Sequence, residues 1–136
     1  MNPPVITYTA GCWDLLHRGH LNFLWQSKQL GDILVVGVVQ DASYKGVETA
    51  QPAFARRAAI ARIPWVDVVV SQAGTDPTEV LERIRPDIMT HADDWTRLKE
   101  GHETLERLGI EWVLIPYTEG ISSTELRQQR SGDDGG

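Results

Sequence analysis

Cysteine is almost absent from this 136-residue sequence, in which Cys12 is the single example. One thiol cannot form an internal disulfide, so the fold must be held together by its core. Sparse cysteine is typical of proteins that work in a reducing compartment, and we expect a cytoplasmic location. Cys12 comes just after a predicted strand, where a small buried side chain is the default expectation.

Basic residues are also few. The chain has 13 Lys and Arg against 19 Asp and Glu, which gives a formal net charge of −6. Proteins that bind nucleic acid broadly present a basic face, so no nucleic-acid partner is expected. A phosphate ligand remains compatible with this charge, because a few local cations and helix amino termini can hold one.

Long hydrophobic runs and two common nucleotide-binding motifs are missing as well. No apolar segment reaches the roughly 20 residues that span a bilayer, and no signal peptide opens the chain, so no membrane partner is expected. Neither a Walker A loop nor a Gly-x-Gly-x-x-Gly motif occurs. Their absence argues against a phosphate-loop NTPase and against a nicotinamide dehydrogenase.

The sequence does contain a regular alternation of strand and helix patterns. Apolar and β-branched runs predict strands at 5–9, 33–39, 66–70, 87–90 and 112–115. Helical spacing predicts a helix that opens within 11–20 and closes at Gly31, then helices at 52–63, 77–85 and 98–108, and a last helix from Ser122. This order predicts one α/β domain over residues 1–130, a Rossmann-like five-stranded parallel sheet with helices on both faces. Residues 131–136 are expected to be a flexible tail or linker.

Distinctive polar stretches follow the first, fourth and fifth predicted strands, at 11–20, 91–95 and 117–127. The carboxyl ends of parallel strands lie at one edge of the sheet, and ligands of such sheets bind there, where the strand order reverses. Random placement would scatter the three stretches over both edges. Their convergence predicts a single site.

The first of these stretches carries two histidines, His17 and His20, at the start of a helix. At this spacing they share one face of the first helical turn. The unpaired N–H groups and the dipole of that turn favour an anion, and Gly19 leaves room for a phosphate to approach the backbone. Two other interpretations stay open, metal ligation and ordinary polar residues at a helix start. A zinc site would need a third protein ligand, and the remaining histidines lie far along the chain.

Three blocks together resemble the nucleotidyltransferase superfamily with the His-x-Gly-His motif. The blocks are Gly11 to Leu30, Asp93-Asp94-Trp95 and Thr118-Glu119-Gly120-Ile121-Ser122. In order and spacing they are most similar to the small cytidylyltransferases that act on glycerol-3-phosphate, choline phosphate and ethanolamine phosphate. The resemblance covers nearly the whole chain and is less specific for the substrate than for the superfamily.

The resemblance implies that an oxygen of a phosphate or phosphonate monoester attacks the α-phosphorus of CTP and that pyrophosphate leaves. His17, His20 and Lys45 would be the catalytic residues, with the histidines as donors to the phosphates. Asp14 would organise the site or a Mg²⁺ ion, which the triphosphate brings. The other nucleotide-binding residues that it implies are Gly11, Cys12, Gly19, Arg56, Asp94, Trp95, Thr118, Gly120, Ile121, Ser122, Ser123 and Thr124.

Two departures from the family pattern concern the choice of nucleotide. Ala92 precedes Asp93-Asp94-Trp95, where the family has glycine, and Tyr117 occupies the position of an arginine that supports nucleotide binding. The closing block also resembles that of adenylyltransferases on this fold. An ATP-dependent adenylyltransferase and a catalytically silent nucleotide-binding module therefore remain alternatives to the CTP-dependent enzyme.

Two further expectations concern partners. Relatives of this size form pairs, so we expect a homodimer. The glycine-rich end, Gly132 to Gly136, also raises the alternative that the chain is one domain of a longer bifunctional enzyme.

Overall fold

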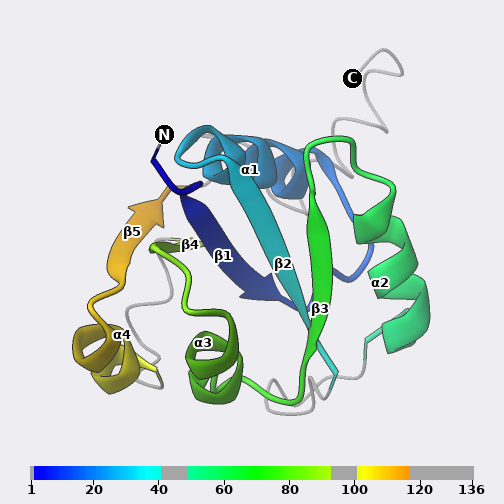
Figure 1. The fold of residues 1–136 in the computed structure, drawn as a ribbon. Helices are drawn as coiled ribbons and strands as arrows, with labels where there is room; N and C mark the ends of the chain where they lie inside the picture. The colour runs from blue at the N-terminus through cyan, green and yellow to red at the C-terminus, as the bar shows by residue number, and fades with distance from the viewer. Residues whose placement is uncertain (1, 41–48, 93–100, 117–136) are drawn as a thin grey trace.

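The computed structural model describes residues 2–40, 49–92 and 101–116. Strands and helices alternate along these residues (Figure 1). The strands are β1 (Ile6–Gly11), β2 (Ile33–Val39), β3 (Val68–Gln72), β4 (Ile88–Ala92) and β5 (Glu111–Ile115). The helices are α1 (Arg18–Gln29), α2 (Ala53–Ala61), α3 (Thr78–Ile84) and α4 (His102–Leu108). None of the helices among the described residues is long and apolar enough to cross a membrane.

All neighbouring strands pair in parallel, in the order β3-β2-β1-β4-β5. The predicted five-stranded parallel α/β sheet is therefore confirmed. Strand order reverses between β1 and β4, so the connections that leave their carboxyl ends run to opposite sides, and ligands of parallel sheets bind at such points. The predicted last helix and the predicted tail at 131–136 lie outside the described residues, and the division into 1–130 and 131–136 stays a prediction.

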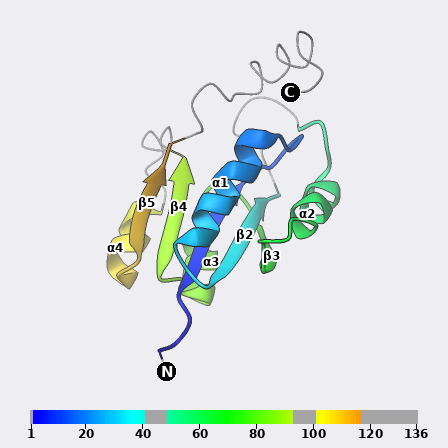
Figure 2. The same ribbon diagram turned by 90° about the horizontal axis from the view of Figure 1, so that it is seen from above.

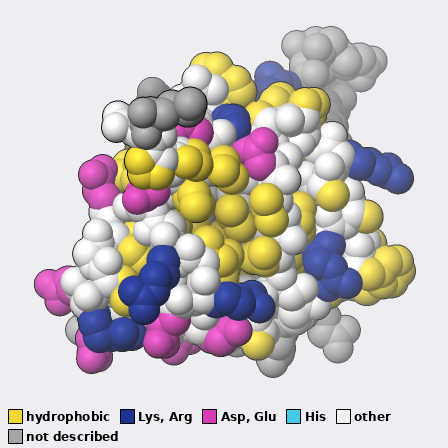
Figure 3. Space-filling model, viewed as in Figure 1, with side chains coloured by type: hydrophobic (Ala, Val, Ile, Leu, Met, Phe, Trp, Pro, Cys, Tyr) yellow, Lys and Arg dark blue, Asp and Glu magenta, His cyan; other side chains and the backbone are white. Residues whose placement is uncertain are grey.

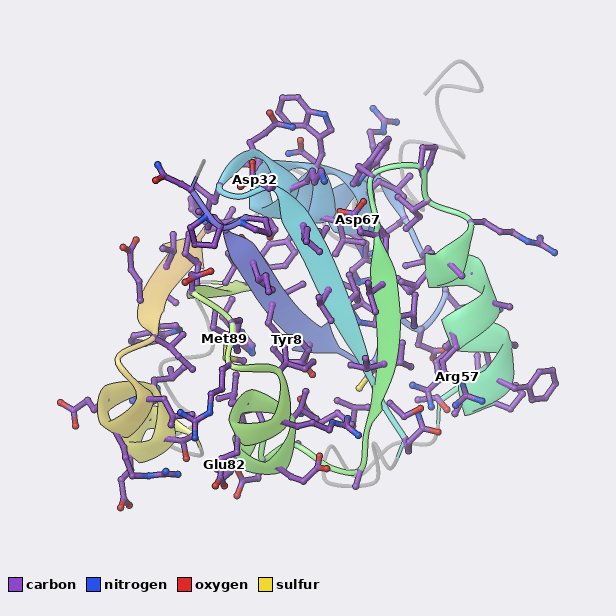
Figure 4. The ribbon with its side chains drawn as sticks, in the orientation of Figure 1. Tyr8, Asp32, Arg57, Asp67, Glu82 and Met89 are labelled. Atoms are coloured by element: carbon purple, nitrogen blue, oxygen red, sulfur yellow. The ribbon has the colours of Figure 1, made fainter. Side chains whose placement is uncertain are left out.

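Helices cover both faces of the sheet (Figure 2), and a hydrophobic layer lies between the sheet and the helices on each face. Alternate residues of β2 point to opposite faces, with Val36 in the layer of α1 and α2 and Val35 in the layer of α3 and α4. Tyr8 and Met89, neighbours in the β1–β4 register, lie on the α3 side (Figure 4). Because α3 has only seven residues, it leaves hydrophobic side chains of this face at the surface (Figure 3). One of them is Val68 of β3, which is 44% exposed.

Buried hydroxyl groups attach α1 to the middle of the sheet. The Ser27 hydroxyl on α1 lies 2.8 Å from the Thr90 hydroxyl on β4, and the Thr9 hydroxyl on β1 donates to the Thr90 carbonyl over 3.0 Å. All three residues are fully buried. Buried polar groups need partners with defined geometry, so these bonds fix how α1 lies across β1 and β4.

Acidic side chains at the amino-terminal edge of the sheet accept main-chain N–H groups. Asp32 accepts from Val5, Asp87 accepts from Ile6, and Asp67 accepts from Leu34 and from the Lys28 ammonium. The hydrogen bonds from Lys28 and Leu34 lower the pKa of Asp67 below its usual value. Figure 4 labels Asp32 and Asp67 at this edge.

The third and fourth strands begin later than the sequence pattern predicts. Residues 66 and 67 belong to the turn after α2, where Val66 N–H donates to Ile63 and Asp67 N–H donates to Leu34. The strand β3 therefore runs from Val68 to Gln72. Main-chain hydrogen bonds determine where these two strands begin. The apolar character of the residues does not indicate those bonds.

We predict that Gly37→Ala destabilises the protein, because a Cβ at this position would overlap the buried Tyr8 hydroxyl. That hydroxyl is held in place, since it donates to Gln72 Oε1 over 2.7 Å and Gln72 donates in turn to Gly74 O over 2.8 Å. Overpacking of this kind costs about 1–3 kcal/mol of unfolding free energy, measured by urea denaturation. Gly74→Ala is the matched control, because a Cβ there meets nothing within 4 Å. Equal stability of the two variants would contradict the packing described.

Candidate active site

The candidate site lies at the carboxyl-terminal edge of the sheet, in the turn that joins β1 to α1. The chain leaves β1 at Gly11 and reaches the helix through Trp13 and Leu15, whose φ angles are 55° and 52°. Positive φ is rare for side chains of this size and costs about 1–3 kcal/mol. Two such residues in one short turn mark a conformation that the surrounding structure imposes.

The Trp13 side chain holds this turn against the sheet. Its indole Nε1 donates to the Gly37 carbonyl of β2 over 2.9 Å, and the ring is almost fully buried. A Cβ on Gly11 would lie 2.9 Å from the indole, so a larger residue there would displace the ring. The indole also meets the His20 ring edge to face, with centroids 5.7 Å apart. The sheet thus positions His20 through the tryptophan.

The two histidines cap α1 reciprocally. His17 is the N-cap residue, and its Nδ1 accepts the Gly19 N–H over 3.1 Å. His20 is the third helical residue, and its Nδ1 accepts the His17 N–H over 3.3 Å. The rings stack with centroids 3.9 Å apart and planes 23° apart. The arrangement has the topology of a capping box, with imidazoles in the places usually taken by serine and glutamate.

These hydrogen bonds determine where the imidazole protons are. A ring nitrogen that accepts an N–H carries no proton, so each neutral ring of His17 and His20 has its proton on Nε2. Two positive rings stacked at 3.9 Å would repel each other, which favours the neutral forms. The pair therefore consists of two neutral Nε2–H donors on the first turn of α1, where the helix dipole favours an anion.

Asp14 clasps the turn to the segment that precedes α2. Its carboxylate accepts the Ala50 N–H over 2.8 Å and the Gln51 N–H over 3.0 Å, one at each oxygen. In the opposite direction, Gln51 Oε1 accepts the Leu15 N–H over 3.1 Å. The predicted contact of Asp14 with Mg²⁺ stays a prediction, and no group of three or more His, Cys, Asp or Glu in the described ranges could hold a metal ion.

Arg56 is buried beneath the site, with 2% of its surface exposed. Its guanidinium donates to four main-chain carbonyls, at 2.9 Å to Cys12, 2.7 Å to Val39, 3.4 Å to Gln40 and 3.0 Å to Gln51. None of the ion pairs between described residues includes it. The sequence predicted Arg56 as a nucleotide-binding cation. Direct contact with a ligand stays a prediction, and this geometry gives it no support.

The structure thus brings together the predicted residues of the first block and Arg56. Cys12 is buried and Gly19 donates to His17. The sequence interpretation missed Trp13 as a positioning side chain and Gln51 as a loop clasp. Gln51 lies just before Pro52 and α2, but no sequence pattern distinguishes a glutamine that bonds a distant N–H. The predicted residues Lys45, Asp94, Trp95, Thr118, Gly120, Ile121, Ser122, Ser123 and Thr124, together with Tyr117, lie outside the described residues.

A hollow of about 550 Å³ runs along α3, away from the two histidines. Asp76, Glu79 and Glu82 line it together with Thr78 and Arg83. Arg83 lies 3.8 Å from Glu79. Three carboxylates would repel a triphosphate, so this hollow does not compete with the helix start as an anion site.

His91, at the carboxyl end of β4, makes stability depend on pH. Burial, together with a smaller contribution from nearby His102, lowers the pKa of its imidazole from 6.5 to about 3. Below about pH 6.5 the His91 imidazole binds a proton in the unfolded chain but stays neutral in the folded chain. The contribution of the neutral imidazole to the stability of the folded protein is therefore complete above that pH. We predict that it is lost as the pH falls toward 3, by up to about tenfold in the folding constant per pH unit.

Urea unfolding of the wild type and of His91→Asn between pH 7 and pH 4 measures this effect. Carboxylates contribute acid sensitivity to both proteins, so the difference between the two slopes isolates His91. We expect the variant to lose stability more slowly on acidification. Parallel slopes would show that His91 takes up protons as readily in the folded state as in the unfolded one.

Known proteins with similar sequences indicate the family of this chain. A family model described as cytidylyltransferase-like matches residues 8–129. The chain is 38% identical to the bifunctional protein HldE of Desulfatibacillum aliphaticivorans, over 90% of this chain and 26% of that protein. It is 36% identical to the ethanolamine-phosphate cytidylyltransferase of Arabidopsis thaliana, over 90% of this chain and 31% of that protein.

A solved structure supports the same grouping. The lipopolysaccharide core biosynthesis protein of Thermoplasma volcanium superposes with a TM-score of 0.75 at 26% identity, over 86% of this chain and 100% of that chain. The chain spans only about a quarter to a third of the two longer relatives. With the family match running through the histidine motif and across the whole sheet, this chain belongs to the cytidylyltransferase-like family of nucleotidyltransferases.

Proposed function

We propose that this chain transfers CMP from CTP to a small phosphate or phosphonate monoester and releases pyrophosphate. The observation that carries the proposal is the stacked pair of imidazoles that caps the first turn of α1, at the carboxyl edge of the sheet. The cytidylyltransferase relative from Arabidopsis thaliana, at 36% identity, supports CTP as the donor. Its name also supports a phosphate monoester as the acceptor.

The reaction is a single in-line displacement at the α-phosphorus. An oxygen of the acceptor phosphate forms a bond to that phosphorus while the bond to the bridging oxygen of the β-phosphate breaks. The electron pair leaves with pyrophosphate. A phosphate monoester has a second pKa near ~6, so it is already mostly ionised at neutral pH and needs no general base. The protein therefore has to orient two anions and stabilise the charge that develops during transfer.

His17 and His20 supply that stabilisation. Each Nε2–H donates a hydrogen bond without bringing a charge that must be neutralised when the product leaves. The amino terminus of α1 adds its dipole, which favours an anion. Because Nδ1 is held by the main chain, the donors need no reorganisation as the reaction proceeds.

Mg²⁺ is expected to enter with the triphosphate. Both carboxylate oxygens of Asp14 accept main-chain N–H groups. The described part of the chain offers no other cluster of ligands for an ion. Phosphate oxygens are therefore the better ligands, and the ion would neutralise part of the charge of the triphosphate.

ATP is the second candidate donor. Tyr117 stands where the family has an arginine that supports nucleotide binding. The relative at 38% identity is a bifunctional HldE protein rather than a cytidylyltransferase by name. A nucleotide-sugar or a dinucleotide would then be the product. A silent nucleotide-binding module is a weaker alternative, because the reciprocal histidine cap is intact.

Our proposals for the whole protein follow the same relatives. Since the chain spans 26% of one HldE protein, it is proposed to work beside a second enzymatic domain. A homodimer is proposed because relatives of this size form pairs. A cytoplasmic location is proposed because the chain has a single cysteine. Neither carries weight in the mechanism.

Thermal unfolding with CTP and with ATP, each with Mg²⁺, tests the choice of donor. A ligand at a hundred times its dissociation constant stabilises the folded state by about 2.7 kcal/mol. We expect a clear rise in melting temperature with CTP and a small one with ATP. A shift with ATP alone would replace the cytidylyl proposal by the adenylyl one, and Tyr117→Arg would then be expected to restore part of the response to CTP.

We predict that His20→Ala lowers turnover by roughly 10²–10³, as the loss of other donors to developing charge does. His20→Asn is the matched control. The Asn side-chain oxygen can take the place of Nδ1 and keep the cap on the His17 N–H, while the Nε2 donor is lost. We expect both variants to lose turnover, and His20→Asn to retain more stability than His20→Ala.

Single-turnover rates and melting temperatures, measured side by side, separate catalysis from capping. If His20 acts only as a cap, His20→Asn will keep near-normal turnover per folded molecule. That outcome would remove His20 from the chemistry.

A further inference from the structure

The geometry points to a positioning role for Arg56 and Asp14, two residues that the sequence pattern assigns to nucleotide binding. Arg56 and Asp14, together with Gln51, form a brace that positions the His17–His20 pair and does not itself bind nucleotide. We define the brace by these three side chains. This inference rests on the proposed function, because positioning matters only if the histidines act in transfer.

The first step concerns the hydrogen bonds that the Arg56 guanidinium already makes. A guanidinium has five N–H donors, and four are used on the carbonyls of Cys12, Val39, Gln40 and Gln51. With 2% of its surface exposed and one N–H group left, the side chain could bind a phosphate through two or more N–H groups only by giving up some of these bonds. The carbonyls of Cys12 and Val39, whose bonds to Arg56 are buried, would then lose a donor, which is costly.

The second step is what those carbonyls belong to. Cys12 lies between β1 and the two histidines, Val39 ends β2 and is followed by Gln40, and Gln51 precedes α2. One planar group therefore joins three segments that are far apart in the sequence. Main-chain carbonyls carry partial negative charge, and here they stabilise a buried cation for which the described residues provide no carboxylate partner.

The third step connects the brace to the imidazoles. Cys12 is followed by Trp13, whose indole meets the edge of His20. Asp14 and Leu15 follow in turn and are clasped to the segment at 50–51 by three hydrogen bonds. The carbonyl of Gln51 is itself an acceptor of Arg56. The strained turn of Trp13 and Leu15 is therefore held on one side by Arg56 and strand β2 and on the other by the segment at 50–51. His17, the N-cap of α1, lies two residues after Leu15.

Arg56→Lys tests the brace, because lysine keeps the charge but presents its donors at one point and cannot reach three segments. Arg57→Lys is the matched control, since the neighbouring Arg57 donates to the Gln40 side chain and to none of these carbonyls. The spectroscopic readout is the ¹⁵N NMR signal of the histidine ring nitrogens, which distinguishes the two neutral tautomers. The kinetic readouts are kcat and the KM for the triphosphate.

In the wild type and in Arg57→Lys we expect His17 and His20 to have the proton on Nε2. In Arg56→Lys we expect mixed tautomers and a fall in kcat of about 10- to 100-fold, as for misplaced catalytic groups. The KM for the triphosphate should change by less than about twofold, because no direct contact is lost. In a His20→Ala background, Arg56→Lys should cost much less than it does alone.

Unchanged tautomers together with a raised KM and a normal kcat would overturn the brace and make Arg56 a phosphate ligand. If Arg56→Lys does not fold, Gln51→Ala replaces it, since it removes only the acceptor of the Leu15 N–H; a wild-type tautomer and kcat in that variant would also overturn the inference. Absence of transfer by the wild type with every triphosphate would refute the proposed function instead, and the ring spectra would still decide the brace.

Discussion

The reciprocal hydrogen bonding of two imidazoles to the main chain at the start of α1 is the interaction on which the site depends. It satisfies two of the N–H groups that a helix start leaves without partners. The same two bonds select the ring tautomer, so one geometric device stabilises the helix and prepares two donors. A serine and a glutamate could cap the helix equally well. Histidine adds a neutral N–H donor on the far side of the ring.

The rest of the fold holds this cap in place through features that each cost free energy of folding. Positive φ at Trp13 and Leu15 and a buried guanidinium at Arg56 are all unfavourable in isolation. They are sustained by bonds to strand β2, at Gly37 and Val39, and by the clasp at Gln51. Strain and buried charge gather where the site needs one conformation, which is typical of functional sites.

Much of the fold could be predicted because its signals are local. The apolar run at 33–39 and the alternation of strands and helices predicted the parallel sheet, and the histidine spacing predicted the helix start. The fine structure of the site could not be predicted in this way. Arg56 and Gln51 act through main-chain groups, and any residue can supply a carbonyl or an N–H, so the partners leave no trace in the sequence. The start of β3 moved for a similar reason, since the turn at Val66 is set by its hydrogen bond to Ile63.

Release of pyrophosphate tests the central claim most directly, that the braced histidine pair serves nucleotidyl transfer. The wild type and His20→Asn would be assayed with each of the four nucleoside triphosphates against a panel of phosphate and phosphonate monoesters. The account predicts release that requires both substrates, is greatest with CTP, and falls by roughly 10²–10³ in the variant. No release with any pair, or equal release by the two proteins, would contradict it.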